Sequence, residues 1–194
     1  MIIIGITGTL GAGKGTVVDY LVKEKEFAHF SVRDFIAREL ERRGMPVNRD
    51  TLTAMANSMR AKSSPSYIIE KLYEAAVALG RNCVIESIRT PGEIEALRSK
   101  PHFYLLAVDA DPRIRYNRIK KRNSETDQVS YDTFIMNEER EMHSDDPNKQ
   151  NLAECIFQAD HVIMNDRDRE ALHRETEAFF TTIAAADKRS EENG

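Results

Sequence analysis

Short apolar runs alternate with longer helical patterns along the chain. The apolar runs predict strands at residues 1–6, 29–32, 83–88, 103–108 and 161–164. Between them, apolar residues recur at the spacing of amphipathic helices, at 16–25, 34–43, 50–59, 68–79, 91–97, 111–122 and 172–183. Strands that alternate with helices are typical of a parallel sheet covered on both faces. The sequence therefore predicts an α/β fold.

The same pattern predicts the domain organisation. A single domain is expected over residues 1–187, with a frayed tail at 188–194. Two regions are candidates for movement on this domain, an insertion at about 48–80 and a polar stretch at 123–150. Within the polar stretch, Tyr131, Phe134 and Ile135 indicate one amphipathic helix.

Composition and charge argue against several classes of function. The chain has 28 basic and 32 acidic side chains and a net charge of −4, so nucleic acid is an unfavourable partner. The apolar run at the N-terminus ends at Gly5, which favours neither a signal peptide nor a membrane span. Cys83 and Cys155 stand apart in apolar segments, which predicts free thiols in a reduced, cytoplasmic protein.

A glycine-rich loop lies between the first predicted strand and the first predicted helix. It consists of Gly8, Thr9, Leu10, Gly11, Ala12, Gly13, Lys14, Gly15 and Thr16. Glycines allow the backbone to wrap around phosphates with its N–H groups inward, and the helix N-terminus adds a partial positive charge. Lys14 is expected to reach the β- and γ-phosphates of a nucleotide. Because Gly15 follows the lysine where Ser or Thr is usual, Thr16 is the candidate protein ligand for Mg²⁺.

The loop and two later segments resemble a family of kinases. The run 8–16 is similar to the phosphate loop of nucleoside monophosphate kinases, the adenylate kinase relatives. The segment 84–90 is similar to their third-strand signature, and 159–165 resembles dephospho-coenzyme A kinases. The resemblance covers most of the chain. It implies a three-layer P-loop NTPase fold, an α/β fold with a five-stranded parallel sheet flanked by helices, plus acceptor-binding and lid insertions.

The resemblance also implies roles in catalysis and metal binding. Arg89 would hold the phosphate of the acceptor, and Glu86 would orient water on Mg²⁺. Lys14, Arg118 and Arg122 would stabilise the charge on the transferring phosphoryl group, the two arginines from the lid. The alternatives are a surface arginine at 89, a buried pair of Glu86 with Lys14 or Arg89, and a solvated basic helix face that includes residues 118 and 122.

Four further residues are candidates for ligand binding. Asp34 and Arg38, one helical turn apart, resemble the helix start that meets the acceptor nucleotide, although a plain ion pair explains them almost as well. Arg60 lies in the predicted acceptor-binding insertion. Asn165, just after the last predicted strand, would contact the base of the donor, with a simple turn as the alternative.

These expectations favour one function over two alternatives. The favoured function is transfer of the γ-phosphoryl of ATP·Mg²⁺ to a small-molecule acceptor, a nucleoside or deoxynucleoside monophosphate. The first alternative is phosphorylation of a ribose hydroxyl, as in dephospho-coenzyme A kinases, with Asp34 as the base. The second is a nucleotide-binding switch that is not a kinase. It is weakened because no aspartate is followed three residues later by glycine and an NKxD run is absent.

Overall fold

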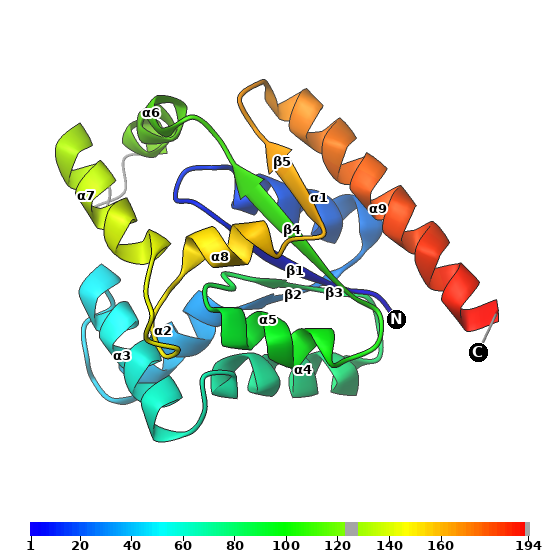
Figure 1. Ribbon diagram of the computed structural model, residues 1–194, viewed down its shortest axis with the longest axis horizontal. Helices are drawn as coiled ribbons and strands as arrows, with labels where there is room; N and C mark the ends of the chain where they lie inside the picture. The colour runs from blue at the N-terminus through cyan, green and yellow to red at the C-terminus, as the bar shows by residue number, and fades with distance from the viewer. Residues whose placement is uncertain (123–127, 193–194) are drawn as a thin grey trace.

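Strands and helices alternate in the computed structural model, which describes residues 1–122 and 128–192 (Figure 1). The elements are β1 (Ile3–Gly8), α1 (Lys14–Lys25), β2 (Ala28–Ser31), α2 (Val32–Arg42), α3 (Arg49–Lys62), α4 (Tyr67–Leu79), β3 (Cys83–Glu86), α5 (Pro91–Arg98), β4 (Phe103–Asp109), α6 (Pro112–Arg122), α7 (Tyr131–Met142), α8 (Leu152–Phe157), β5 (His161–Met164) and α9 (Arg169–Glu192).

The five strands form one parallel sheet in the order β2-β3-β1-β4-β5. β1 lies at the centre, where Ile3 is in register with Cys83 on one side and with Phe103 on the other. Every residue of β1 is buried, which explains why its sequence is a continuous apolar run rather than an alternating one. The five-stranded parallel sheet that the sequence predicts is confirmed.

Helices cover both faces of the sheet (Figure 1). On one face, α1 and α9 bury Leu21 and Ile183 against the strands. On the other face, α4, α5 and α8 contribute Ile69, Ile94 and Cys155 to a second apolar cluster. The sheet is thus the middle of three layers, and its functional surface has to lie at an end of the strands.

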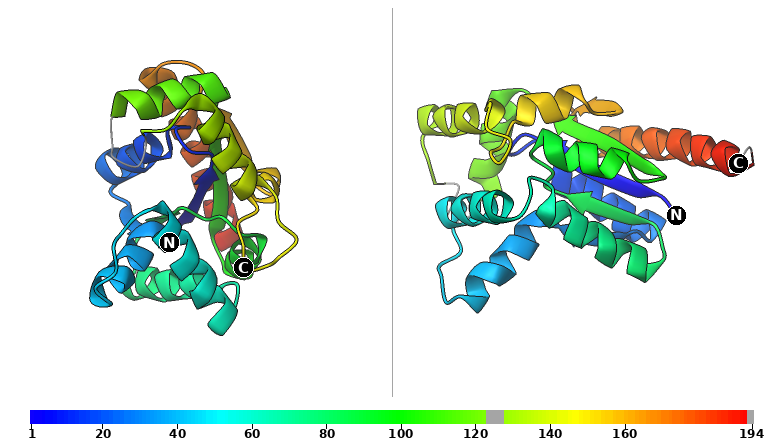
Figure 2. Two further views of the ribbon diagram at one scale, coloured as in Figure 1. Left: turned by 90° about the vertical axis from the view of Figure 1, so that its left-hand side faces the viewer. Right: turned by 60° about the horizontal axis from the view of Figure 1, so that its bottom comes forward.

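Four helices gather at one end of the sheet. Figure 2 shows α2, α3, α6 and α7 at the end opposite the two chain termini. In parallel sheets this carboxyl end of the strands is where ligands bind. The loop that joins β1 to α1 opens at the same end.

Three segments differ from the predicted pattern or extend it. The helix α8 was not predicted, since only six residues form it. The helix α9 continues to Glu192, through part of the segment 188–194 predicted to fray, because lysine, arginine and glutamate favour helix there. Of the predicted lid, α7 is described, whereas residues 123–127 lie outside the described residues. Within the described ranges, no helix has the length and apolar character needed to cross a membrane.

Candidate active site

The loop between β1 and α1 packs closely against its neighbours. Gly8 and Gly13 have φ angles of 127° and 107°, which residues with a Cβ rarely adopt. A Cβ at Gly8 would lie 1.9 Å from the carbonyl oxygen of Val108, and one at Gly13 would lie 2.4 Å from Nδ2 of Asn165. The loop therefore requires glycine at both positions, and its backbone rests directly on β4 and on the residue that follows β5.

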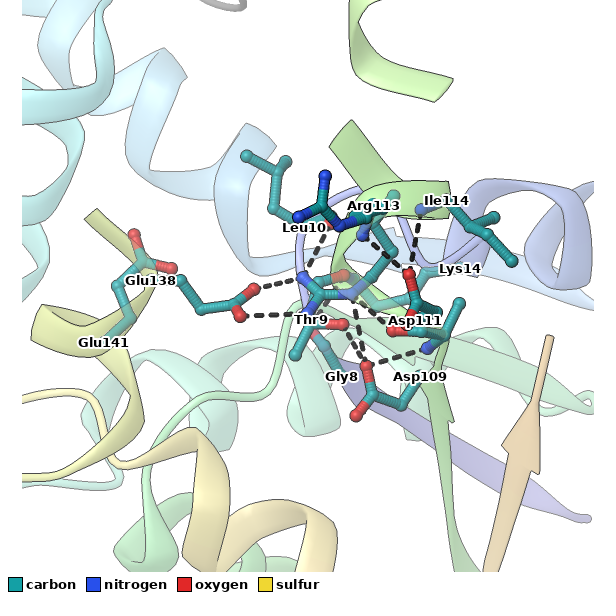
Figure 3. A network of polar contacts seen from close by, with 12 residues as sticks. Gly8, Thr9, Leu10, Lys14, Asp109, Asp111, Arg113, Ile114, Glu138 and Glu141 are labelled. Atoms are coloured by element: carbon teal, nitrogen blue, oxygen red, sulfur yellow. Dashed lines mark hydrogen bonds and ion pairs between the residues drawn. The ribbon is translucent and has the colours of Figure 1, made fainter. Parts of the chain in front are cut away.

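Lys14 folds back into the loop that precedes it. Its Nζ donates hydrogen bonds to the carbonyl oxygens of Gly8 at 2.8 Å and of Thr9 at 2.6 Å (Figure 3). Burial, reinforced by the positive charge of Arg89, lowers the pKa of Lys14 to about 7. The ammonium group is thus held inside the curve of the loop, in surroundings that disfavour its charge until an anion arrives.

A polar network fixes the loop to α6 and α7 (Figure 3). The Thr9 hydroxyl donates to Asp109 at 2.5 Å. Arg115 donates to the carbonyl oxygens of Ala110 at 2.7 Å and of Leu10 at 3.4 Å, and it forms a bidentate ion pair with Glu138 of α7. Because Arg115 is only 2% exposed, its charge is neutralised by partners rather than by water.

The sequence analysis did not name Arg115 as a site residue. The signal that identifies its buried position is the spacing to Ile119, four residues later, which lies on the same side of α6 and is also buried. Arg115 thus belongs to the apolar side of its helix, despite its charge.

A cavity of about 510 Å³ opens next to the loop, and we call it the larger cavity. Elements at the carboxyl end of the sheet line it, together with Leu10 of the loop. Its lining is rich in arginine and has one apolar wall. The lining residues are Leu10, Arg33, Ile36, Arg49, Leu52, Thr53, Ala56, Arg60, Ser87, Arg89, Arg122, Glu141 and Gln150.

Glu141 of α7 lies between two arginines of the larger cavity. Its carboxylate accepts from Arg49 at 2.5 Å and from Arg89 at 2.7 Å. Arg89 also donates to Oε1 of Gln150 at 2.7 Å. Burial acts to raise the pKa of Glu141, but the charges and hydrogen bonds of the two arginines outweigh burial and lower it. The sequence analysis missed Glu141, because a glutamate in a charge-dense helix gives no signal of its own.

Arg60 also lines the larger cavity, but a buried ion pair holds its guanidinium. It donates to Glu93 at 2.7 Å, and the two residues are 3% and 0% exposed. The same carboxylate accepts from the backbone N–H groups of Arg89 at 2.9 Å and of Thr90 at 3.2 Å. Glu93 therefore fixes the backbone from which Arg89 reaches into the cavity.

Glu86 is the last residue of β3, and its carboxylate interacts with the charge of Lys14. His29 lies 3.5 Å from its carboxylate. Burial acts to raise the pKa of Glu86, but the hydrogen bond and charge of His29, a hydrogen bond from Ser31 and the charge of Lys14 lower it overall. The next residue, Ser87, has a φ of 70°, a strained conformation of the kind that clusters at functional sites.

A smaller cavity of about 280 Å³ also borders the loop, at Gly13 and Thr16. It is lined by Gly13, Thr16, Arg118, Asn165, Arg167, Arg169 and Leu172. Arg118 donates to the carbonyl oxygen of Arg167 at 3.3 Å. The side-chain amide of Asn165 donates to the carbonyl oxygen of Ala12 at 2.7 Å, so this buried residue supports the loop from below.

The structure separates some of the residues that the sequence analysis had grouped. Arg118 lines the smaller cavity, whereas Arg122 lines the larger one. Asp34 and Arg38 are both exposed and line neither cavity. The ion pair of Asp34 is with Arg33, at 3.9 Å, rather than with Arg38. In the described part of the chain, no three His, Cys, Asp or Glu side chains come together as a metal site.

The fold and the loop define a P-loop kinase-like protein of the α/β class. Shikimate kinase from Bacteroides thetaiotaomicron superposes with a TM-score of 0.60 over 94% of this chain and 98% of that one, at 16% identity. A gluconokinase from Sinorhizobium meliloti superposes with a TM-score of 0.56 over 100% and 97%, at 11% identity. At these identities the likeness shows the fold, and it confirms the predicted fold class.

The chain belongs to the AAA domain family AAA_18, whose model matches residues 4–143. It is similar to the UPF0200 protein of Methanococcus vannielii, which is 28% identical over 171 residues that cover 87% of this chain and 89% of the relative. The UPF0200 protein of Pyrococcus abyssi is 27% identical over 187 residues, or 93% and 96% of the two chains.

Proposed function

We propose that the protein transfers the γ-phosphoryl group of ATP·Mg²⁺ to a nucleoside or deoxynucleoside monophosphate. The observation that carries the proposal is the glycine-rich loop, in which Lys14 folds back onto Gly8 and Thr9, while Leu10 lines the arginine-rich larger cavity and Gly13 and Thr16 line the smaller one. Phosphoryl transfer asks the protein mainly to position two reactants and to stabilise negative charge between them. The P-loop kinase-like fold supports the proposal as well.

The donor is proposed to lie along the glycine-rich loop, residues 8–16. Its triphosphate would take the hydrogen bonds of Lys14 that the carbonyl oxygens of Gly8 and Thr9 now accept. Its nucleoside would enter the smaller cavity, where Arg118 offers a guanidinium plane to a base. Asn165 supports this site through the carbonyl group of Ala12.

Thr16 and Glu86 are the proposed protein groups for Mg²⁺. A hydroxyl and a carboxylate oxygen are ligands that this ion prefers, and it usually keeps several waters and phosphate oxygens as well. The pKa of Glu86, held low despite burial, keeps that carboxylate charged. When bound, Mg²⁺ would neutralise part of the charge on the phosphates.

The acceptor is proposed to lie in the larger cavity, whose volume suits a small-molecule ligand. Arg49 and Arg89 would bind its phosphate, while Ile36 and Leu52 offer an apolar wall to its base. Arg122 lines the same cavity and would approach the transferring phosphoryl group. Arg60 would act indirectly, since its ion pair with Glu93 holds the backbone of Arg89.

The state of the carboxylates favours a phosphate acceptor over a hydroxyl acceptor. A hydroxyl group needs a base to take its proton, whereas a phosphate oxygen attacks as an anion. Among the described lining residues, Glu141 is the one carboxylate of the larger cavity, and its ion pairs with two arginines make it a poor base. Asp34, the base required by the dephospho-coenzyme A alternative, is exposed outside the cavity.

A screen for ADP release across ribo- and deoxynucleoside monophosphates tests the proposal. Dephospho-coenzyme A, gluconate and shikimate serve as hydroxyl acceptors, the last two because the structural neighbours are named for them. We expect turnover with a monophosphate. Turnover with hydroxyl acceptors alone would support the hydroxyl alternative, and tight ATP binding without any turnover would support the switch.

Two variants test the division of roles between donor and acceptor. Lys14→Met is expected to lower kcat by about 10²- to 10³-fold, the usual cost of losing one donor to the transition state. Arg89→Ala is expected mainly to raise the KM for the acceptor. Arg98→Ala, in the helix α5 that follows Arg89, is the matched control. Equal losses of ATP affinity in the Lys14 and Arg89 variants would contradict these roles.

A further inference from the structure

The helix α7 presents two carboxylates to the site, one helical turn apart. Glu138 and Glu141 are spaced i,i+3, so they lie on the same side of the helix. Glu138 binds Arg115, which in turn donates to the carbonyl oxygen of Leu10 in the loop. Glu141 binds Arg49 of α3 and Arg89 after β3. One helix thus contacts the loop and the arginines of the larger cavity at the same time.

Glu141 takes up one guanidinium nitrogen of Arg49 and one of Arg89, two arginines that an anionic ligand of the larger cavity would contact. Nη1 of Arg89 is shared between Glu141 and Gln150, at 2.7 Å each, so both of its hydrogens are engaged. Nη2 of Arg49 donates to the other carboxylate oxygen of Glu141 at 2.5 Å. A second anion can bind these same nitrogens only if the carboxylate leaves them.

The charges that line the larger cavity also favour the binding of an anionic ligand in place of Glu141. Two of the arginines in the described lining, Arg49 and Arg89, share the single carboxylate of Glu141, so their two positive charges exceed the one negative charge of that carboxylate. The Glu141 side chain is 14% exposed, which means that water screens its ion pairs weakly. A phosphate carries more negative charge than a carboxylate and can bind both guanidinium groups with several oxygens, so it can replace Glu141.

We propose that Glu141 is an internal anion that occupies the phosphate position of the larger cavity and is displaced by the phosphate group of the acceptor. Acceptor binding then frees the end of α7 from Arg49 and Arg89, while Glu138 keeps the helix attached to Arg115. This inference rests on the proposed function for the location of the acceptor. It adds that Glu141 of α7 contacts Arg49 and Arg89 only while the acceptor is absent.

Titration of inorganic phosphate into the full-length protein, followed by calorimetry, tests the inference. A saturating non-hydrolysable ATP analogue with Mg²⁺ first fills the loop, so that phosphate enters the larger cavity. Glu141→Gln keeps the shape of the side chain but removes its charge. If Glu141 holds the arginines about nine-tenths of the time, its neutralisation should tighten phosphate binding about tenfold. Glu139→Gln, an exposed position on the same helix, is the control and should bind like the wild type.

The outcomes separate this inference from the proposed function. Failure of the ATP analogue to bind would overturn the proposed function. In that case the inference is still tested, because phosphate is then titrated without the analogue into Glu141→Gln and Glu139→Gln and the two affinities are compared. Phosphate binding by Glu141→Gln that equals or falls below that of the wild type would overturn the inference. That result would mean instead that Glu141 holds Arg49 and Arg89 in position for the phosphate.

Hydrogen exchange of the wild-type protein provides a test without any variant. Phosphate should speed amide exchange in α7, residues 131–142, since the helix loses its contacts with Arg49 and Arg89. Exchange in α9 on the distal part of the sheet should stay the same. Slower or unchanged exchange in α7 at saturating phosphate would contradict the displacement of Glu141.

Discussion

At the scale of single residues, the site depends on charges that are largely shielded from water. Lys14 is the clearest case, because burial and the charge of Arg89 lower its pKa to about 7 in the ligand-free protein. At pH 8 the amine is therefore mostly neutral. A bound triphosphate favours the charged form and raises the pKa again.

We predict that ATP binding at pH 8 takes up about one proton per molecule, the amount expected when one group crosses from neutral to charged. Calorimetry in buffers of different ionisation enthalpy measures this uptake. At pH 6 Lys14 is protonated before and after binding, so the lysine should contribute little there. The Lys14→Arg variant stays charged throughout and should lose the pH 8 uptake. ATP binding to the wild type at pH 8 without proton uptake would contradict the buried position of the amine.

The pair of Arg60 and Glu93 gives a prediction for stability. Removal of one partner leaves the other charge buried and unpaired, which typically costs about 3–5 kcal/mol. Arg60→Met should therefore lower the free energy of unfolding by about that amount in a denaturant titration. Lys62→Met, at the exposed end of the same helix, should change it little. A loss below about 1 kcal/mol for Arg60→Met would mean that the pair is not buried as described.

At the scale of elements, α7 is held to α6 by aromatic side chains as well as by charge. Phe134 is 2% exposed, and its ring lies 5.7 Å from that of Tyr116 and 6.2 Å from that of Tyr131. The guanidinium of Arg115 lies 5.5 Å above the ring of Phe134. The position of Glu138 and Glu141 over the site therefore depends on the Phe134 ring as well as on their ion pairs.

Removal of the Phe134 ring should weaken the packing of α7 against α6. Phe134→Ala is expected to lower the free energy of unfolding by about 3–5 kcal/mol, as for other buried phenylalanines. It should also speed amide exchange across residues 131–142. Met136→Ala, whose side chain is 47% exposed on the same helix, is the control for the helix sequence itself. Similar stability losses in the two variants would contradict the anchoring role of Phe134.

At the scale of the whole molecule, the sequence predicts the sheet and the loop better than the rest of the site. Buried parallel strands are apolar without interruption, so β1 and β4 are visible as continuous runs. The loop is visible because its backbone conformation excludes other residue types, as at Gly8. Both signals are local in the sequence.

The charged residues of the site carry no such local signal. Arg115 and Glu93 are buried because partners far along the chain neutralise them, Glu138 in one case and Arg60 in the other. Glu141 contacts Arg89 across 52 positions of sequence. These pairings arise only when α3, α6 and α7 meet at the carboxyl end of the sheet. Asp34 is the opposite case. Its position at the start of a helix suggests a role in acceptor binding, but in the fold its side chain is exposed and lines neither cavity.

The proposed function needs room for two ligands, and the glycine-rich loop contributes to the lining of two cavities. Leu10 of the loop lines the larger cavity, and Gly13 and Thr16 line the smaller one. The chain as a whole is acidic, with a net charge of −4, while the larger cavity gathers arginines. This contrast favours the binding of anionic ligands in the larger cavity.

The most direct test of the account is to identify the product by ³¹P NMR. The wild-type protein is incubated with ATP·Mg²⁺ and a nucleoside monophosphate that is active in the screen. We predict the paired phosphate signals of a new nucleoside diphosphate in an amount equal to the ADP formed, and about 10²- to 10³-fold slower growth of these signals with Lys14→Met. Free inorganic phosphate as the only product, or a phosphate attached to a hydroxyl of the acceptor, would contradict the account.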